Sequence, residues 1–225
     1  MNIAEVYQKG QVTFMGIEIS VAPGTLVPRE ETELLGFTAI AQLEAMSIES
    51  PTIIDMCCGS GNLACALATR FPRAQVWACD LEDSCIHLAR QNVQRLGLDG
   101  QVRVVQGDLF ASLAGVGLDG RVDVIVCAPP YISQAKLAGE SAELLAHEPR
   151  AAFDAGPYGL SIHQRVVREC VPFLRPGGVM LFEVGHGQEG QVKRLFTRAK
   201  SFDEAASVAD AAGDPRVVYA RRKTD

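Results

Sequence analysis

The sequence predicts one α/β domain built on a doubly wound, mostly parallel sheet of seven strands, preceded by a short N-terminal hairpin and helix. Three observations support this prediction. Short apolar runs of strand type alternate with amphipathic segments of helical length, and this alternation produces right-handed crossovers and helices on both faces of a sheet. The 225 residues, 48% of them hydrophobic, suffice to bury a core in one domain. No internal repeat or linker divides the chain.

We expect residues 1–50 to form the hairpin and helix, packed on a core made by residues 51–225. Apolar and polar side chains alternate over 12–22 around a glycine, which predicts the hairpin. A loop followed by a helix is expected over 23–46, because a cluster of glutamates suits the positive start of a helix.

The core alternates between strands and helices. Strands are predicted at 51–58, 74–80, 101–108, 121–131 and 179–185, helices at 59–71, 82–97, 159–178 and 188–200, and two short final strands around 202–209 and 216–222. Two prolines stop the fourth strand, because proline cannot continue a ladder. Pro-Gly-Gly at 176–178 is expected to close the third helix just before the fifth strand.

Composition restricts the partners and the compartment. Lys and Arg number 21 against 27 Asp and Glu, a net charge of −6, and no basic stripe is interleaved with aromatics, so nucleic acid is an unexpected partner. No run of 18 apolar residues predicts a membrane span, and the first residues lack the apolar core of a signal peptide. Seven cysteines without a C-x-x-C pair and four scattered histidines predict no metal site. We therefore expect a soluble, cytoplasmic protein.

A ligand site is expected beside the first core strand, where doubly wound sheets bind ligands beyond the carboxyl ends of their strands. Asp55 lies there, followed by a glycine-containing turn over 57–61 that opens a helix. Glycines let the backbone turn sharply and approach a ligand. Asp80 ends the next strand, 21 positions after Gly59, where a carboxylate accepts hydrogen bonds from ribose hydroxyls. An adenosine-containing cofactor is predicted.

The segment 59–64 also fits the dinucleotide fingerprint G-x-G-x-x-A, but three features favour S-adenosylmethionine over NAD. Asp55 would repel a pyrophosphate, whereas it could face the amino or sulfonium side of S-adenosylmethionine. Asp108, at the end of the third strand, is placed to accept a hydrogen bond from the adenine amino group. Ala-Pro-Pro-Tyr at 128–131 makes a rigid, aromatic-edged floor where a methyl group would be delivered.

Separate segments of the chain resemble the HemK/PrmC family, the release-factor glutamine methyltransferases among the Rossmann-like class I enzymes. The stretch Pro28–Glu33, the segment Glu148–Arg150 and the end of the fifth strand at Glu183, Gly185 and Gln188 are similar to that family, and the resemblance covers roughly residues 14–222. It implies that the turn over 57–61 wraps the methionine part of the cofactor, that Asp80 binds the ribose, and that Asp108 and Leu109 border the adenine.

The predicted site residues fall into three groups. The catalytic group is Ala128, Pro129, Pro130 and Tyr131. The cofactor-binding group is Asp55, Cys57, Cys58, Gly59, Ser60, Gly61, Asp80, Leu81, Asp108, Leu109, Cys127 and Ala128. The substrate-binding group is Arg29, Glu31, Thr32 and Tyr131. Glu148 and Arg150 are expected to pair with each other and shape the loop after the Pro-Pro turn.

The chain departs from the family's Asn-Pro-Pro-Tyr signature at Ala128. In the family, the asparagine oxygen and a backbone carbonyl accept the two amide hydrogens of glutamine, and such partners contribute about 3–4 kcal/mol each. Alanine cannot accept a hydrogen bond. In addition, only about 22 residues precede the segment that begins at Pro23, where the family usually carries a helical domain. We therefore expect methyl transfer to a nitrogen or other nucleophilic atom of a small metabolite.

Alternative functions remain open on the sequence. One is methylation of a protein glutamine amide of release-factor type, so that the acceptor is a peptide. Another is a non-catalytic protein that binds S-adenosylmethionine, for which the missing asparagine would be typical. A third is a nicotinamide-dependent oxidoreductase, which the fingerprint at 59–64 leaves possible.

Overall fold

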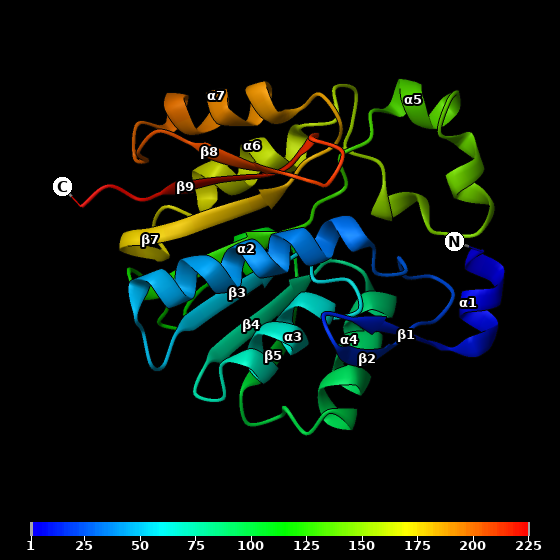
Figure 1. The fold of residues 1–225 in the computed structure, drawn as a ribbon, viewed down its shortest axis with the longest axis horizontal. Helices are drawn as coiled ribbons and strands as arrows, with labels where there is room; N and C mark the ends of the chain where they lie inside the picture. Colours follow the sequence, from blue (N-terminus) through cyan, green and yellow to red (C-terminus); the bar gives the residue numbers. More distant parts are fainter. Residues whose placement is uncertain (1, 225) are drawn as a thin grey trace.

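The computed structural model describes residues 2–224 and has the predicted fold class. Seven strands form one sheet in the order β5-β4-β3-β6-β7-β9-β8. The first five of these are parallel, and β9 runs antiparallel to both of its neighbours, β7 and β8. Figure 1 shows helices packed along both sides of this twisted sheet. The strand order reverses beside β3, which is where a ligand site is expected.

The N-terminal part contains the predicted hairpin and helix. Its elements are α1 (Ile3–Lys9), β1 (Gln11–Phe14), β2 (Ile17–Ser20) and α2 (Glu30–Met46). The short helix α1 was not predicted. Helix α2 packs against α3, β6, β7 and β9. The division of the chain at residue 50 stays a prediction.

The core elements follow the predicted alternation. They are β3 (Thr52–Met56), α3 (Asn62–Arg70), β4 (Gln75–Asp80), α4 (Asp83–Arg95), β5 (Val102–Gln106), β6 (Val122–Cys127), α6 (Ser161–Glu169), β7 (Leu174–Glu183), α7 (Glu189–Ala199), β8 (Ala206–Ala209) and β9 (Pro215–Arg221). Four short elements had no sequence signal: η1 (Leu109–Leu113), α5 (Gln134–Ala138), η2 (Ala142–Ala146) and η3 (Arg150–Ala152). The last three belong to the long excursion between β6 and α6 at the upper right of Figure 1.

The prediction for Pro-Gly-Gly at 176–178 was wrong. Helix α6 ends at Glu169, and the tripeptide lies inside β7. The register with β6 shifts there, because Val122 pairs with Leu174 whereas Val124 pairs with Val179. An irregularity of this kind accommodates a proline, which has no N–H for the ladder.

The core has two layers, one on each face of the sheet. Alternate residues of β3 contribute to opposite layers: Ile53 packs with α2, α3 and α4, and Ile54 packs with η1, α6 and α7. Such alternation is the side-chain period of a strand. Helices therefore cover the strands from both sides, and the carboxyl ends of the five parallel strands meet at one edge of the sheet.

None of the described helices is long and apolar enough to cross a membrane.

Candidate active site at the carboxyl ends of the strands

A cavity of about 340 Å³ lies beyond the carboxyl ends of β3, β4, β5 and β6. Its volume is within the range of small-molecule sites. Predicted cofactor residues that line it are Cys57, Gly59, Asp80, Leu81, Asp108, Leu109 and Ala128, and Pro130 joins them from the catalytic group. Wall residues that sequence reasoning missed include Gly24, Leu26, Met56, Cys79, Glu82, Cys85, Gly107, Pro149, Ala151, Ala152, Asp154 and Ile162.

The turn between β3 and α3 forms one wall. Its backbone is left-handed at Cys57 (φ 62°), Gly59 (φ 53°) and Gly61 (φ 75°), a region that favours glycine. Apart from its own chain neighbours, no described residue has an atom within 4 Å of the position that a Cβ would take at Gly59. A Cβ at Gly61, in contrast, would lie 3.1 Å from the Ala89 side chain of α4. Gly59 therefore leaves space at the cavity, and Gly61 lets the start of α3 lie close to α4.

Asp80 joins this turn to the end of β4. One carboxylate oxygen accepts a hydrogen bond from the Gly59 backbone N–H at 2.9 Å, and the other accepts one from Glu82 N–H at 3.1 Å. Burial raises the pKa of Asp80, and these backbone hydrogen bonds oppose the shift. The Leu81 backbone and the Cys85 thiol also hydrogen-bond to this carboxylate, which lies on the cavity wall.

Asp55 lies behind the turn rather than on the cavity wall. Its side chain is fully buried, and one oxygen accepts a hydrogen bond from the Ala64 N–H at 2.9 Å. No described residue donates a hydrogen bond to the other oxygen. Burial raises the pKa of Asp55 to about 8, opposed by the Ala64 hydrogen bond and assisted by the charge of Asp80. Four more predicted cofactor positions lie outside the lining: Cys58, Ser60, Gly61 and Cys127.

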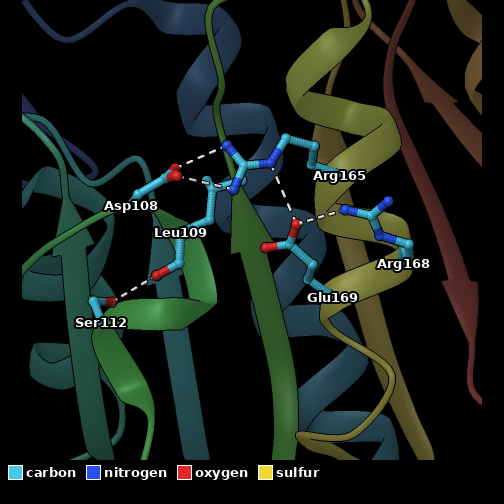
Figure 2. Close-up of polar contacts among 6 residues, drawn as sticks. All are labelled: Asp108, Leu109, Ser112, Arg165, Arg168 and Glu169. Atoms are coloured by element: carbon cyan, nitrogen blue, oxygen red, sulfur yellow. Dashed lines mark hydrogen bonds and ion pairs between the residues drawn. The ribbon is translucent and has the colours of Figure 1, made fainter.

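Asp108 and Leu109 follow β5 at the other end of the cavity. Leu109 has a left-handed backbone (φ 48°), and its carbonyl accepts a hydrogen bond from Ser112 Oγ at 2.7 Å. Figure 2 shows the Asp108 carboxylate paired with the guanidinium of Arg165 from α6. Sequence reasoning missed Arg165, which lies 57 positions away and carries no motif.

The Ala-Pro-Pro-Tyr segment only partly faces the cavity. Ala128 and Pro130 line it, whereas Pro129 is buried and Tyr131 lies outside the lining. The Tyr131 hydroxyl accepts a hydrogen bond from Arg216 Nη2 at 3.4 Å. Burial and then the charge of Glu183 raise the pKa of Tyr131. The Tyr131 side chain therefore lies near Arg216 of β9 and near Gly185 just beyond β7, and its role at the floor stays a prediction.

Gln188, just before α7, connects three chain segments at this floor. Its side-chain oxygen accepts a hydrogen bond from Gly185 N–H at 2.9 Å. Its amide donates to the carbonyls of Tyr131 at 2.8 Å and Gly159 at 3.2 Å. A Cβ at Gly185 would lie 2.9 Å from both Gln188 and Tyr131. Only glycine fits that close approach, so the segment 128–131 is held against the end of β7.

The predicted substrate-binding residues gather around Glu183 and Glu148 rather than on the cavity wall. Thr32 donates a hydrogen bond to the buried Glu183 carboxylate at 2.7 Å, and burial raises the pKa of Glu183. Glu31 lies 3.8 Å from Arg216. Arg29 pairs with Glu148, which also accepts a hydrogen bond from Val27 N–H at 3.0 Å.

The expected pair between Glu148 and Arg150 is wrong. Glu148 is occupied by Arg29, and Arg150 pairs with Asp154 at 3.0 Å, one helical turn further on. The tertiary structure explains the difference: Arg29, at the start of α2, lies next to Glu148 although the two residues are 119 positions apart in the sequence.

The cavity wall is acidic. Asp80, Glu82, Asp108 and Asp154 line it, and among the described lining residues there is no Lys, Arg or His. Asp108 and Asp154 are paired with Arg165 and Arg150, so Asp80 and Glu82 are the wall carboxylates without an arginine partner among the ion pairs described. A wall of this charge favours a cation over an anion. S-adenosylmethionine fits this wall because its sulfonium and ammonium groups are positive, and the open space at Gly59 leaves room for it. No group of three or more potential metal ligands was found among residues 2–224.

Comparison with known proteins agrees with this geometry. The model of the methyltransferase small domain matches residues 38–157. The release factor glutamine methyltransferase of Moorella thermoacetica is 35% identical over 219 residues, which cover 97% of this chain and 75% of that protein. The 4-amino-L-phenylalanine/4-methylamino-L-phenylalanine methyltransferase of Streptomyces pristinaespiralis is 37% identical and covers 88% of this chain and 66% of that protein.

A solved structure is similar as well. The release factor-specific protein-(glutamine-N5) methyltransferase of Alicyclobacillus acidocaldarius superimposes with a TM-score of 0.52 at 26% identity, covering 91% of this chain and 99% of that one. The matched family transfers methyl groups from S-adenosylmethionine, which excludes a nicotinamide-dependent oxidoreductase. On these matches the chain belongs to the class I S-adenosylmethionine-dependent methyltransferases, in the group of HemK/PrmC type.

Proposed function

We propose that this methyltransferase acts on a nucleophilic atom of a small metabolite, and that this atom is an amine nitrogen. The observation that carries the proposal is the alanine at position 128, where the family has asparagine. Ala128 follows β6 and lines the cavity beside Pro130, so its methyl group faces the space in which methyl transfer would occur.

The cofactor end of the proposed site uses residues on the cavity wall. When bound, S-adenosylmethionine supplies an electrophilic methyl group. Asp80, on the cavity wall, would accept hydrogen bonds from the ribose hydroxyls, and the backbone N–H groups of Gly59 and Glu82 hold its carboxylate in place. Asp108 and Leu109 would border the adenine, and the turn over 57–61 would wrap the methionine part. Asp55 would act from behind that turn, by holding the start of α3 through the hydrogen bond from Ala64 N–H.

An amine suits the acceptor end better than an amide. The lone pair of an amide nitrogen is delocalised into its carbonyl, so methylation needs partners that hold both amide hydrogens. Ala128 offers no side-chain acceptor for either. The lone pair of an amine is free, and alignment with exclusion of water is then sufficient. The two prolines stiffen the floor, and we assign Tyr131 the role of anchoring it through Arg216 rather than stacking on the acceptor.

The amine acceptor is supported by the S. pristinaespiralis relative, whose name places its methyl groups on an aromatic amine of an amino acid. A second candidate acceptor is the glutamine amide of a release factor. The comparisons favour this second candidate over a metabolite, because the M. thermoacetica relative aligns over more of both chains and the A. acidocaldarius enzyme bears the same activity in its name. The two candidates differ in what they require at position 128.

The deciding experiment measures methyl transfer from labelled S-adenosylmethionine to 4-aminophenylalanine and to a glutamine peptide. We expect the wild-type protein to prefer the amine. Ala128→Asn should raise transfer to the peptide by about 10²-fold, since one preorganised partner contributes roughly 10²–10³ in rate. Ala128→Leu, which is branched at Cγ like asparagine but has no acceptor oxygen, is the matched control and should not raise it.

Two results would count against the amine proposal. A wild-type protein that methylates the glutamine peptide faster than any amine tested would support the release-factor candidate instead. Equal amide activity in the asparagine and leucine variants would show that hydrogen bonding at position 128 does not limit the reaction.

A further inference from the structure

An arginine that was not among the predicted site residues holds one of the cavity carboxylates. Arg165 Nη1 donates to Asp108 Oδ1 at 2.9 Å, and Arg165 Nη2 donates to Asp108 Oδ2 at 3.0 Å. In Figure 2 the guanidinium reaches from α6 to the end of β5 and meets both carboxylate oxygens side by side. Glu169, four residues further along α6, accepts a hydrogen bond from Arg165 Nε at 3.2 Å. Both edges of the guanidinium are therefore held.

This ion pair lies at the surface and at the cavity at once. The side chains of Arg165 and Asp108 are 37% and 56% exposed, so solvent screens the pair, although its bidentate geometry is the kind that can add to stability. Asp108 also lines the cavity. The pair links a helix to the wall of the site, so a consequence is expected in ligand binding, and thermal melting separates it from an effect on stability.

A forked pair fixes the carboxylate while leaving it able to accept another hydrogen bond. Each oxygen uses one lone pair on the guanidinium and retains another. Because the side chain is already ordered, a ligand that donates to Asp108 does not have to immobilise it, and such preorganisation strengthens binding. A ligand with an acceptor atom at the same point is repelled, because the ion pair holds the carboxylate oxygen in place.

We propose that Arg165 is a positioning residue that holds Asp108 toward the exocyclic amino group of adenine, so that the protein distinguishes an adenine-containing cofactor from its hypoxanthine analogue. Hypoxanthine carries a carbonyl oxygen where adenine carries the amino group, so it faces the Asp108 carboxylate with an acceptor. The proposal rests on the cofactor placement proposed above. It adds a residue from α6 that was not among the predicted site residues.

The experiment compares the affinities of S-adenosylhomocysteine and S-inosylhomocysteine by calorimetry. The wild-type protein should bind the adenine compound more tightly. In Arg165→Ala, affinity for S-adenosylhomocysteine should fall about 3- to 10-fold, the usual cost of ordering one side chain on binding, and the ratio between the two ligands should shrink. Arg165→Lys keeps the charge but loses the fork, so it should restore the ratio only in part. Methyl transfer at saturating cofactor should keep its kcat, while the KM for the cofactor rises.

The matched control is Arg168→Ala. Arg168 bonds the same Glu169 at 3.1 Å and is 76% exposed, and Figure 2 shows it on the far side of Glu169 from Asp108. Affinities and their ratio should stay at wild-type values in this variant. Unchanged thermal melting of both arginine variants would confirm that the effect is on binding.

The outcomes separate the role of Arg165 from the placement of the cofactor. If Asp108→Ala loses the discrimination but Arg165→Ala keeps both the affinity and the ratio, the positioning role is overturned and the placement stands. If Asp108→Ala keeps the full discrimination, the adenine lies elsewhere, and the placement fails together with the role of Arg165.

Discussion

The cofactor end and the floor of the cavity are built in different ways. At the cofactor end, Asp80 is held by backbone N–H groups of Gly59 and Glu82, which belong to the turns that directly follow β3 and β4. At the floor, the segment 128–131 is held by the side chains of Gln188 and Arg216, 57 and 85 positions from Tyr131. Backbone contacts survive most substitutions, whereas the floor depends on particular side chains. We therefore expect cofactor binding and acceptor turnover to be separable by mutation.

The largest effect is expected at the cofactor end. Asp80→Ala removes both proposed ribose contacts and the tether to Gly59, so cofactor affinity should fall roughly 10²-fold or more, since each hydrogen bond to a charged group contributes about 1.5–3 kcal/mol. Calorimetry with S-adenosylhomocysteine measures it. Asp99→Ala, at an exposed position before β5, is the control. A loss below about 3-fold would mean that Asp80 does not contact the ribose.

An intermediate effect is expected at the floor. Gln188→Ala removes three hydrogen bonds of a neutral side chain, and the released segment should misplace the acceptor, so kcat should fall about 10-fold or more. The affinity for S-adenosylhomocysteine should stay unchanged, because Gln188 does not line the cavity. Gln191→Ala, exposed on the same helix, should keep wild-type kinetics. An equal loss of cofactor affinity and turnover in Gln188→Ala would contradict the separation of the two regions.

The last prediction concerns the stability of the protein rather than its activity, through Asp55 and pH. The pKa of Asp55 is raised to about 8 in the folded protein, whereas a carboxyl of the unfolded chain titrates near 4. Between these values the folded protein keeps a proton that the unfolded chain has released, so the free energy of unfolding falls as the pH rises from about 4 to 8. Asp55→Asn keeps an acceptor for Ala64 and removes the titration.

Thermal melting between about pH 5 and pH 8.5 tests this linkage. The decline of Tm toward high pH should be shallower in Asp55→Asn than in the wild-type protein, and Asp99→Asn should follow the wild type. Parallel curves for all three proteins would mean that Asp55 is ionised throughout the range.

The parts of the fold and site that could be predicted share a local cause. Alternating apolar runs identify the sheet because each strand is buried between two layers of helices, as Ile53 and Ile54 illustrate. The turn at 57–61 could be found because its left-handed backbone demands glycines at fixed spacing. Pro-Gly-Gly at 176–178 misled prediction, because the same residues that end a helix also accommodate an irregular strand.

By itself, then, the sequence determined the doubly wound sheet, the position of the site beside β3 and the cofactor class, because each depends on residues adjacent in the chain. Tertiary structure alone decided that Arg29 meets Glu148, that Arg165 holds Asp108 and that Gln188 braces the floor. These partners lie 57 or more positions apart, on elements brought together by the burial of apolar faces elsewhere in the fold. No local pattern encodes such a contact. The hydrophobic effect brings these elements together, and because it is non-directional it does not specify which polar side chains meet.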